Sequence, residues 1–275
     1  EPIQEINRAI AVMGKLFFFL LVVKDVFLRY SQSSEPSIVR VDPFLMNSRS
    51  IFGPAKILDL HLLEFTRAKD KIPYGTYVAF ENLGTVFPAA TIATSKKEPG
   101  YWDSLSNYDS DQALMIVTGN FGSDEYEMKK IIQFMEEGND VFISAMNISY
   151  EVTQMMKCDI NAAEGLMYYF EQNEGSDLLS VSLSKPPFGK KNSYTYPGIR
   201  YDFYFYKIDT TTTTVLGYDK SNNPNFVHLK AGKGNLYVHL APMTFSNYFL
   251  LHGKNISYYE NVLSVISPAT RKVVW

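Results

Sequence analysis

Two continuous apolar runs on either side of an amphipathic segment constrain the fold more than any other sequence feature. The runs are residues 113–118 and 140–146. Unbroken apolar runs of this length are typical of parallel strands that are buried on both faces. Between them, Ile131, Ile132 and Met135 form an apolar stripe at helical spacing. The order strand, helix, strand predicts a parallel sheet covered by helices.

Residues that favour turns and helix ends surround these elements. Residues 119–122 (Gly-Asn-Phe-Gly) predict the turn after the first strand, and Ser123 is the expected helix N-cap. Gly138 fits the C-terminal cap of the same helix. Ser149 can cap a second helix over residues 150–157. Further helices are expected after Thr76, within residues 242–251 and over residues 258–266.

The middle of the chain is rich in β-forming residues. Residues 178–184, 199–208 and 212–219 alternate or carry many aromatic and β-branched side chains, with turn residues between them. Residues 225–230 and 235–240 are expected to form a hairpin around Gly232-Lys233-Gly234. The predicted fold is therefore α/β. It has a mostly parallel sheet with flanking helices and an antiparallel β-rich insertion at about residues 176–222.

The N-terminal part carries the other long apolar segment, residues 9–28, whose uninterrupted core is residues 16–23. A membrane-spanning helix needs about 20 mostly apolar residues, which this segment reaches only if Lys15, Lys24 and Asp25 are tolerated. A membrane or export signal and a buried or interfacial helix are equally supported. We expect residues 1–64 to be an anchor or signal plus linker, and residues 65–275 to be the folded domain. The start at Glu1 and the end at Trp275 suggest a fragment or a processed chain.

Charge and cysteine content exclude several classes of protein. The net charge is -3, so no basic field covers the chain, and nucleic acid is not expected as a partner. Cys158 is the single cysteine, which excludes an intrachain disulfide and a zinc site built from several thiolates.

We expect no catalytic, cofactor-binding or metal-binding residues. A catalytic cysteine sits on a strand-to-helix elbow, whereas Cys158 follows a helix without flanking glycine. The serine elbow G-x-S-x-G is absent, and Gly232-Lys233-Gly234 lacks the spacing of a phosphate-binding loop. His228 and His239 could share a metal only if their strands place them face to face.

Five polar residues near the expected strand ends are candidates for recognition. In open α/β sheets, ligands bind outside the carboxyl ends of the strands. The alternative is that these side chains pack and hydrogen bond to loops. The candidates are Asn120, Asn147, Asn247, Tyr248 and Tyr258.

Three segments give the chain a resemblance to a known family. They are residues 71–77, residues 138–143, and residues 232–239 continuing through Pro242, Phe245, Asn247 and Tyr248. Together they resemble the bacterial domain of unknown function family 4350 over roughly residues 65–266. The resemblance implies a class I glutamine-amidotransferase-like, flavodoxin-like fold, similar to the extracytoplasmic domain of gliding-type auxiliary transport proteins.

The resemblance also implies a location at the cell membrane, with the domain outside the cytoplasm, and no enzymatic role. Its protein partners would belong to a membrane complex with a MoxR-type ATPase system, whose genes lie beside those of the family together with a von Willebrand-like protein. Our main hypothesis is a non-catalytic interaction or sensory domain. The alternatives are a divergent hydrolase or amidotransferase, and a cell-surface glycan-binding module that uses the aromatic residues 201–206.

Overall fold

The computed structural model describes residues 71, 75–161, 178–185, 187–189, 193–197 and 203–275. All of these residues belong to the compact unit Phe52–Trp275. The apolar segment at residues 9–28, and with it the anchor or signal hypothesis, lies outside the described residues. Within the described part of the chain, no helix combines the length and apolarity needed to cross a membrane.

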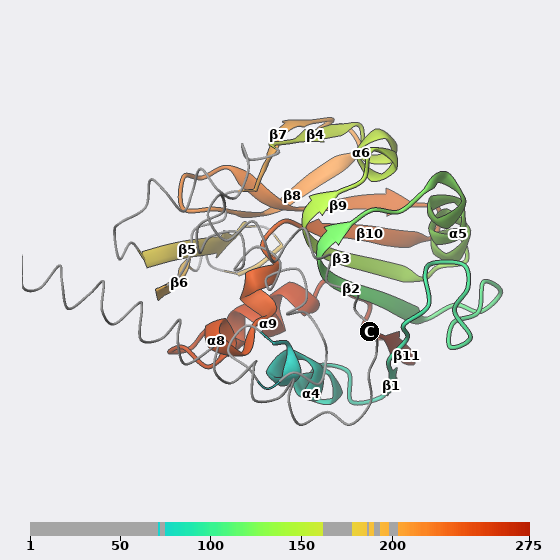
Figure 1. Cartoon of the computed structure of the whole chain (residues 1–275), viewed down its shortest axis with the longest axis horizontal. Helices are drawn as coiled ribbons and strands as arrows, with labels where there is room; N and C mark the ends of the chain where they lie inside the picture. Colours follow the sequence, from blue (N-terminus) through green and yellow to red (C-terminus); the bar gives the residue numbers. More distant parts are fainter. Residues whose placement is uncertain (1–70, 72–74, 162–177, 186, 190–192, 198–202) are drawn as a thin grey trace, which may run out of the picture. The chain divides into compact units, whose positions relative to one another are not determined.

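A nine-stranded sheet forms the centre of the described structure, in the order β1-β11-β2-β3-β10-β9-β8-β5-β6 (Figure 1). Strands β4 and β7 form a separate antiparallel pair. The bounds are β1 Thr91–Ala93, β2 Gln112–Phe121, β3 Asp140–Ile148, β4 Cys158–Ile160, β5 Leu178–Leu183, β6 Ser193–Pro197, β7 Phe205–Ile208, β8 Thr213–Tyr218, β9 Pro224–Ala231, β10 Gly234–His239 and β11 Lys272–Val274.

Helices cover both faces of this sheet (Figure 1). One face packs against α4, η2, α8 and α9, and the other against α5, α6 and the β4–β7 pair. The bounds are α4 Tyr77–Val86, α5 Glu125–Glu136, α6 Tyr150–Met156, η2 Pro242–Phe245, α8 Asn247–Leu250 and α9 Ile256–Leu263.

The prediction of a mostly parallel, flavodoxin-like sheet is wrong. The pairs β1–β11, β11–β2, β2–β3 and β3–β10 are parallel, whereas β10–β9, β9–β8, β8–β5 and β5–β6 are antiparallel. The sheet is therefore mixed, with few and short helices. The pairing changes from parallel to antiparallel at β10, because a two-residue turn with Gly232 at φ 59 joins β10 to β9 as a hairpin.

The predicted insertion at about residues 176–222 is also corrected. The alternating pattern indicated antiparallel strands, and β5, β6 and β8 are antiparallel. However, these strands do not form an insertion apart from the sheet, because β8 hydrogen bonds to β9 and thereby extends the central sheet. A sequence pattern reports which faces of a strand are buried and does not report which neighbour the strand pairs with.

The short strand β11 was not predicted. Its three residues lie between β1 and β2, and the side chains of Val273 and Val274 are fully buried on opposite faces of the sheet. A run of three residues is too short to give a periodic signal. The end of the described chain is thus an internal strand of the sheet.

The predicted strand–helix–strand unit is confirmed, with different boundaries. Strands β2 and β3 are parallel neighbours joined by α5. Strand β2 continues to Phe121, through most of the predicted turn, and the N-cap of α5 is Asp124 instead of Ser123. Asp124 and Glu127 form a capping box, in which each side chain accepts a hydrogen bond from the other residue's backbone N–H.

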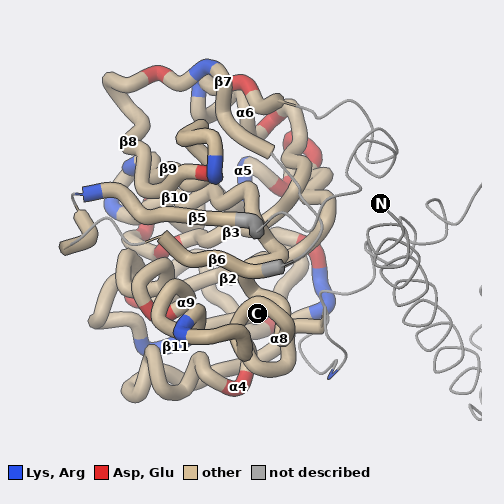
Figure 2. The backbone as a smooth tube through the Cα atoms, turned by 90° about the vertical axis from the view of Figure 1, so that its left-hand side faces the viewer, with Lys and Arg blue, Asp and Glu red and all other residues tan. Residues whose placement is uncertain are grey.

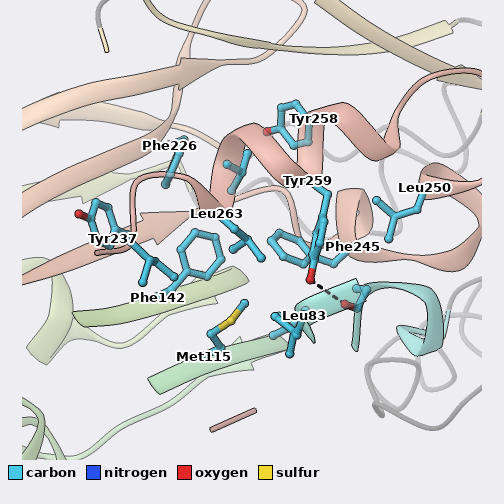
Figure 3. Close-up of a cluster of buried hydrophobic side chains, with 14 of the residues drawn as sticks. Leu83, Met115, Phe142, Phe226, Tyr237, Phe245, Leu250, Tyr258, Tyr259 and Leu263 are labelled. Atoms are coloured by element: carbon cyan, nitrogen blue, oxygen red, sulfur yellow. Dashed lines mark hydrogen bonds between the residues drawn. The ribbon is translucent and has the colours of Figure 1, made fainter. Parts of the chain in front are cut away.

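Aromatic side chains from α8, α9 and the sheet fill the core on one face (Figure 3). Tyr258 and Tyr259 of α9 are fully buried. The hydroxyl of Tyr259 donates a hydrogen bond of 2.6 Å to the carbonyl of Ala79, which ties α9 to α4. A buried tyrosine needs such a partner, because an unpaired hydroxyl in an apolar core is destabilising.

The close approach at Gly234 gives a test of the mixed sheet. A Cβ at this position would lie 1.9 Å from the carbonyl oxygen of Asn139 and 2.6 Å from that of Met135. Both obstacles are backbone atoms, so we expect Gly234→Ala to lower the free energy of unfolding by more than about 3 kcal/mol in urea titrations. The control is Gly84→Ala in α4, where a Cβ meets no atom within 4 Å. This control should be neutral or stabilising by up to about 1 kcal/mol, and equal losses in both variants would contradict the packing described for β10.

Candidate functional site at the carboxyl ends of the parallel strands

The strands β2, β3 and β10 end at the same edge of the sheet, because they are parallel neighbours. We call this edge the carboxyl edge. From β2 and β3 the chain continues into α5 and α6, which pack on one face. From β10 it continues into η2 and α8 on the other face. The chain therefore leaves in opposite directions on the two sides of the β3–β10 boundary, and ligands of open sheets bind beside such boundaries.

Two of the predicted residues meet at this edge. Asn120 and Asn147 are register partners on β2 and β3, and both are exposed. The Nδ2 of Asn147 donates a hydrogen bond of 3.1 Å to the Oδ1 of Asn120. We call these two side chains the amide pair. Within the described residues, the amide nitrogen of Asn120 and the amide oxygen of Asn147 have no further hydrogen-bond partner.

The loops that follow the amide pair are joined to each other. The hydroxyls of Ser123 and Ser149 lie 3.0 Å apart and share a hydrogen bond. The backbone N–H of Ser149 also donates to the carbonyl of Phe121 over 2.8 Å. These contacts fix the start of α6 relative to the end of β2, so the amide pair sits on a preorganised surface.

Exposed tyrosines and acidic residues occupy the first turns of the two helices that follow the amide pair. Tyr126 and Tyr150 lie in the first turns of α5 and α6 and are 45% and 70% exposed. The same turns carry Glu125, Glu127 and Glu151. Figure 2 marks acidic residues in red near α5 and α6. Carboxylates at these positions stabilise helix N-termini and repel anionic ligands.

The other three predicted residues lie on α8 and α9 and do not join the amide pair. Asn247 is buried, and its Oδ1 accepts a hydrogen bond of 2.8 Å from the backbone N–H of Val78. This contact ties α8 to α4. Tyr248 is 37% exposed on α8, whereas Tyr258 is fully buried. Asn247 and Tyr258 are therefore buried and hydrogen bonded within the fold.

A buried polar cluster beneath η2 and α9 was not predicted. Ser144 of β3 and His239 of β10 are register partners, and Ser144 Oγ lies 2.8 Å from His239 Nδ1. On the other side of the ring, His239 Nε2 lies 2.9 Å from the Tyr258 hydroxyl. We call Ser144, His239 and Tyr258 the buried relay. Its members come from three distant elements, so no local motif could have shown it.

Both ring nitrogens of His239 have a hydroxyl partner in the buried relay. Ser144 Oγ faces Nδ1 and the Tyr258 hydroxyl faces Nε2, so in either neutral tautomer one ring nitrogen donates and the other accepts. The hydroxyl of Thr244 in η2 donates to the carbonyl of Ala241 over 2.8 Å. The neutral imidazole is thus satisfied at both nitrogens without a charged partner.

The surroundings of His239 are apolar. Its ring contacts those of Phe142, Phe226 and Phe245, with centroids 5.3–6.2 Å apart. Burial lowers the pKa of His239 from 6.5 to about 3. A serine next to a neutral histidine has the composition of a nucleophile and base. Here the third partner is a tyrosine instead of a carboxylate, and all three side chains are fully buried.

The other titratable candidates are not brought together. His228 pairs with Tyr237 across the hairpin, and His239 pairs with Phe226, so the two histidines do not face each other. His228 Nε2 instead lies 2.9 Å from Asn235 Oδ1. Among the residues that the structure describes, no group of three His, Cys, Asp or Glu side chains is placed to hold a metal ion.

Cys158 begins β4 and is buried. Burial, followed by the nearby carboxylate of Asp159, raises the pKa of its thiol to about 12. A thiol that remains protonated is a poor nucleophile.

The aromatic segment proposed for glycan binding is mostly turned inward. Phe203 and Phe205 are buried against β4 and the adjoining core, whereas Tyr206 is 63% exposed. Residues 201 and 202 lie outside the described residues. Within the described part of this segment, one exposed tyrosine does not form an aromatic binding face.

Comparison with known proteins places this chain in a family. The model of the family "Domain of unknown function (DUF4350)" matches residues 69–263, which is most of the chain. The chain belongs to the DUF4350 family. The match ends within the last turn of α9 and includes the amide pair and the buried relay. No curated protein sequence matches the chain.

Several solved structures are similar to parts of the DUF4350 domain. Exo-β-1,4-mannosidase Op5Man5 from Opitutaceae bacterium strain TAV5 is 10% identical, with a TM-score of 0.37, over 57% of this chain and 26% of that chain. A β-galactosidase from Bacillus circulans sp. alkalophilus is 14% identical, with a TM-score of 0.35, over 57% of this chain and 23% of that chain. The mmIFT52 N-terminal domain is 13% identical, with a TM-score of 0.41, over 59% of this chain and 81% of that chain.

The chain thus spans about a quarter of the length of the two glycosidases it matches. All three TM-scores lie below 0.5, so these likenesses define neither the fold nor the function. The likeness to glutamine amidotransferases expected from the sequence is not supported by the family match, which carries the family alone.

The buried relay predicts how stability depends on pH. Between pH 6.5 and about 3, the unfolded chain holds a proton on His239 that the folded chain does not hold. The contribution of the neutral, buried His239 to the free energy of unfolding is therefore complete above pH 6.5. As the pH falls below 6.5, this contribution is lost by about 1.4 kcal/mol per pH unit. Urea titrations from pH 8 to pH 4 should show this slope, and His239→Gln should lack that part of it. Identical slopes in both proteins would contradict the burial of a neutral histidine.

Proposed function

We propose that this DUF4350 domain is a non-catalytic recognition domain that binds its ligand at the carboxyl edge. The observation that carries this proposal is the separation of the two polar sites. The amide pair is exposed beside the boundary where ligands of open sheets bind, and it has free hydrogen-bonding groups. The buried relay, which has the side chains of a nucleophile and base, is sealed under η2 and α9.

The exposed groups at the carboxyl edge suit binding more than bond cleavage. Amides and tyrosine hydroxyls form oriented hydrogen bonds, but an amide is not a nucleophile, and a tyrosine hydroxyl needs an activating base to become one. The nearby carboxylates of Asp124 and Glu127 are engaged in the capping box of α5. A hydrolase would need Ser144 and His239 to become accessible, which requires η2 and α9 to leave the sheet.

We further propose that the domain is held at the cell membrane, on the extracytoplasmic side, with protein partners in a complex of the MoxR-type ATPase system. The family resemblance of residues 71–77, 138–143 and 232–248 supports this part of the proposal.

A serine-reactive fluorophosphonate probe tests the absence of catalysis. We expect the folded full chain to remain unlabelled at Ser144, because its hydroxyl is buried and hydrogen bonded to His239 inside the core. The control is Ser144→Ala, which gives the background labelling of the other serines. Labelling of the native chain that disappears in this control would show an accessible nucleophile and would favour the divergent hydrolase.

Chemical cross-linking in cells, followed by purification of the full chain, tests the proposed complex. We expect the MoxR-type ATPase system, including its von Willebrand-like protein, to copurify in the membrane fraction. Gly234→Ala, which should strongly destabilise the domain, is the control for retention that depends on the fold. Recovery of the chain in the soluble fraction without these proteins would contradict the proposed location and partners.

A further inference from the structure

We propose that the carboxyl edge binds a neutral, polyhydroxylated ligand, namely a glycan chain, through the amide pair. This inference rests on the proposed function and names the ligand class for the same site. It does not involve residues 201–206, the segment first considered for glycan binding, because Phe203 and Phe205 face the core.

The amide pair offers a donor and an acceptor side by side. Asn147 uses one N–H to reach Asn120, which leaves the amide nitrogen of Asn120 as donor and the amide oxygen of Asn147 as acceptor. If both amides were rotated by 180°, the pair would still present one free donor and one free acceptor. Two neighbouring hydroxyls of a sugar match this arrangement, because one can accept from the donor while the other donates to the acceptor.

Flat aromatic surfaces lie where the two helices begin. Tyr150 follows Asn147 by three residues and is 70% exposed in the first turn of α6. Tyr126 lies in the first turn of α5, but its ring contacts that of Tyr101 with centroids 5.6 Å apart and has Lys130 Nζ 5.5 Å from its centroid, so the more open ring is that of Tyr150. A tyrosine ring presents an apolar face and a polar edge, which suits the C–H face and the hydroxyls of a sugar. The hydrogen bond between Ser123 and Ser149 holds the two helix starts in fixed positions.

The charges at the two helix starts disfavour other ligand classes. Four carboxylates outnumber the two lysines of this part of α5, so phosphates, nucleic acids and acidic glycans are repelled on balance. These residues are Asp124, Glu125, Glu127, Glu151, Lys129 and Lys130. The large apolar side chains exposed in these two helix starts are tyrosines, whereas the anchors of a hydrophobic peptide need an apolar pocket. A neutral ligand that uses hydrogen bonds and aromatic faces remains.

The test is an NMR titration of the full chain with hexasaccharides of glucose, mannose and N-acetylglucosamine, in buffer and detergent without sugar. The side-chain NH2 signals of Asn120 and Asn147 are identified by their absence in Asn120→Ala and Asn147→Ala. We expect at least one neutral hexasaccharide to shift both signals. An oligogalacturonate of the same length, which is acidic, should not shift them.

Matched variants locate the binding. The double variant Asn120→Ala, Asn147→Ala should weaken the affinity about tenfold or more, because two hydrogen bonds to the ligand are lost. Tyr150→Ala should weaken binding, whereas Tyr150→Phe, which keeps the ring, should retain it. Thr214→Ala, at an exposed position on β8, is the control for an unrelated surface and should bind as the native chain does.

Each other outcome overturns the inference. If no neutral hexasaccharide shifts the two signals, or if the double variant binds as tightly as the native chain, the carboxyl edge is not a glycan site. If the double variant instead loses a cross-linked protein partner while no sugar binds, the edge is a protein interface and the proposed recognition function stands. Labelling of Ser144 would overturn that function independently of these titrations.

Discussion

The pairing of β10 determines how the rest of the described structure is arranged. This strand is parallel to β3 on one side and antiparallel to β9 on the other, so it joins the two halves of the sheet. Its alternating side chains serve both cores, with Leu236 and Val238 on one face and Tyr237 on the other. Its carboxyl end also sends the chain to the face opposite α5 and α6, which creates the boundary beside the amide pair.

The buried polar groups of this domain stabilise its core, whereas its exposed amide pair keeps groups that can bind a ligand. Each side chain of the buried relay has a hydrogen-bond partner, and the relay joins β3, β10 and α9 within an apolar core. Such a network stabilises one arrangement of these elements, because breaking it would leave polar groups unpaired in the core. The amide pair has one internal hydrogen bond and unused groups that face solvent. The recognition site that we propose therefore lies at the carboxyl edge, apart from the buried relay.

Local features of the fold could be read from the sequence, whereas the partners of each strand could not. The apolar runs and the stripe through Ile131 and Met135 predicted β2, α5 and β3, and Gly232 predicted the hairpin. The pairing of β8 with β9 and the position of β11 depend on contacts between distant segments. The same limit applies to the site. Asn120 and Asn147 follow predicted neighbouring strands, so their approach could be anticipated, whereas the contact of Ser144 with Tyr258 through His239 required the three-dimensional structure.

The most direct test of a sealed core beside an exposed recognition surface is an NMR titration of the His239 imidazole in the folded chain. The account requires that the ring remain neutral, because Ser144 and Tyr258 hold both nitrogens inside the core. The prediction is that the ring signals do not change between pH 8 and pH 5 and that the ring N–H proton exchanges slowly with solvent. A titration midpoint near the ordinary value of 6.5, with fast exchange, would show that the relay opens to solvent and would contradict the separation of a sealed core from an exposed recognition surface.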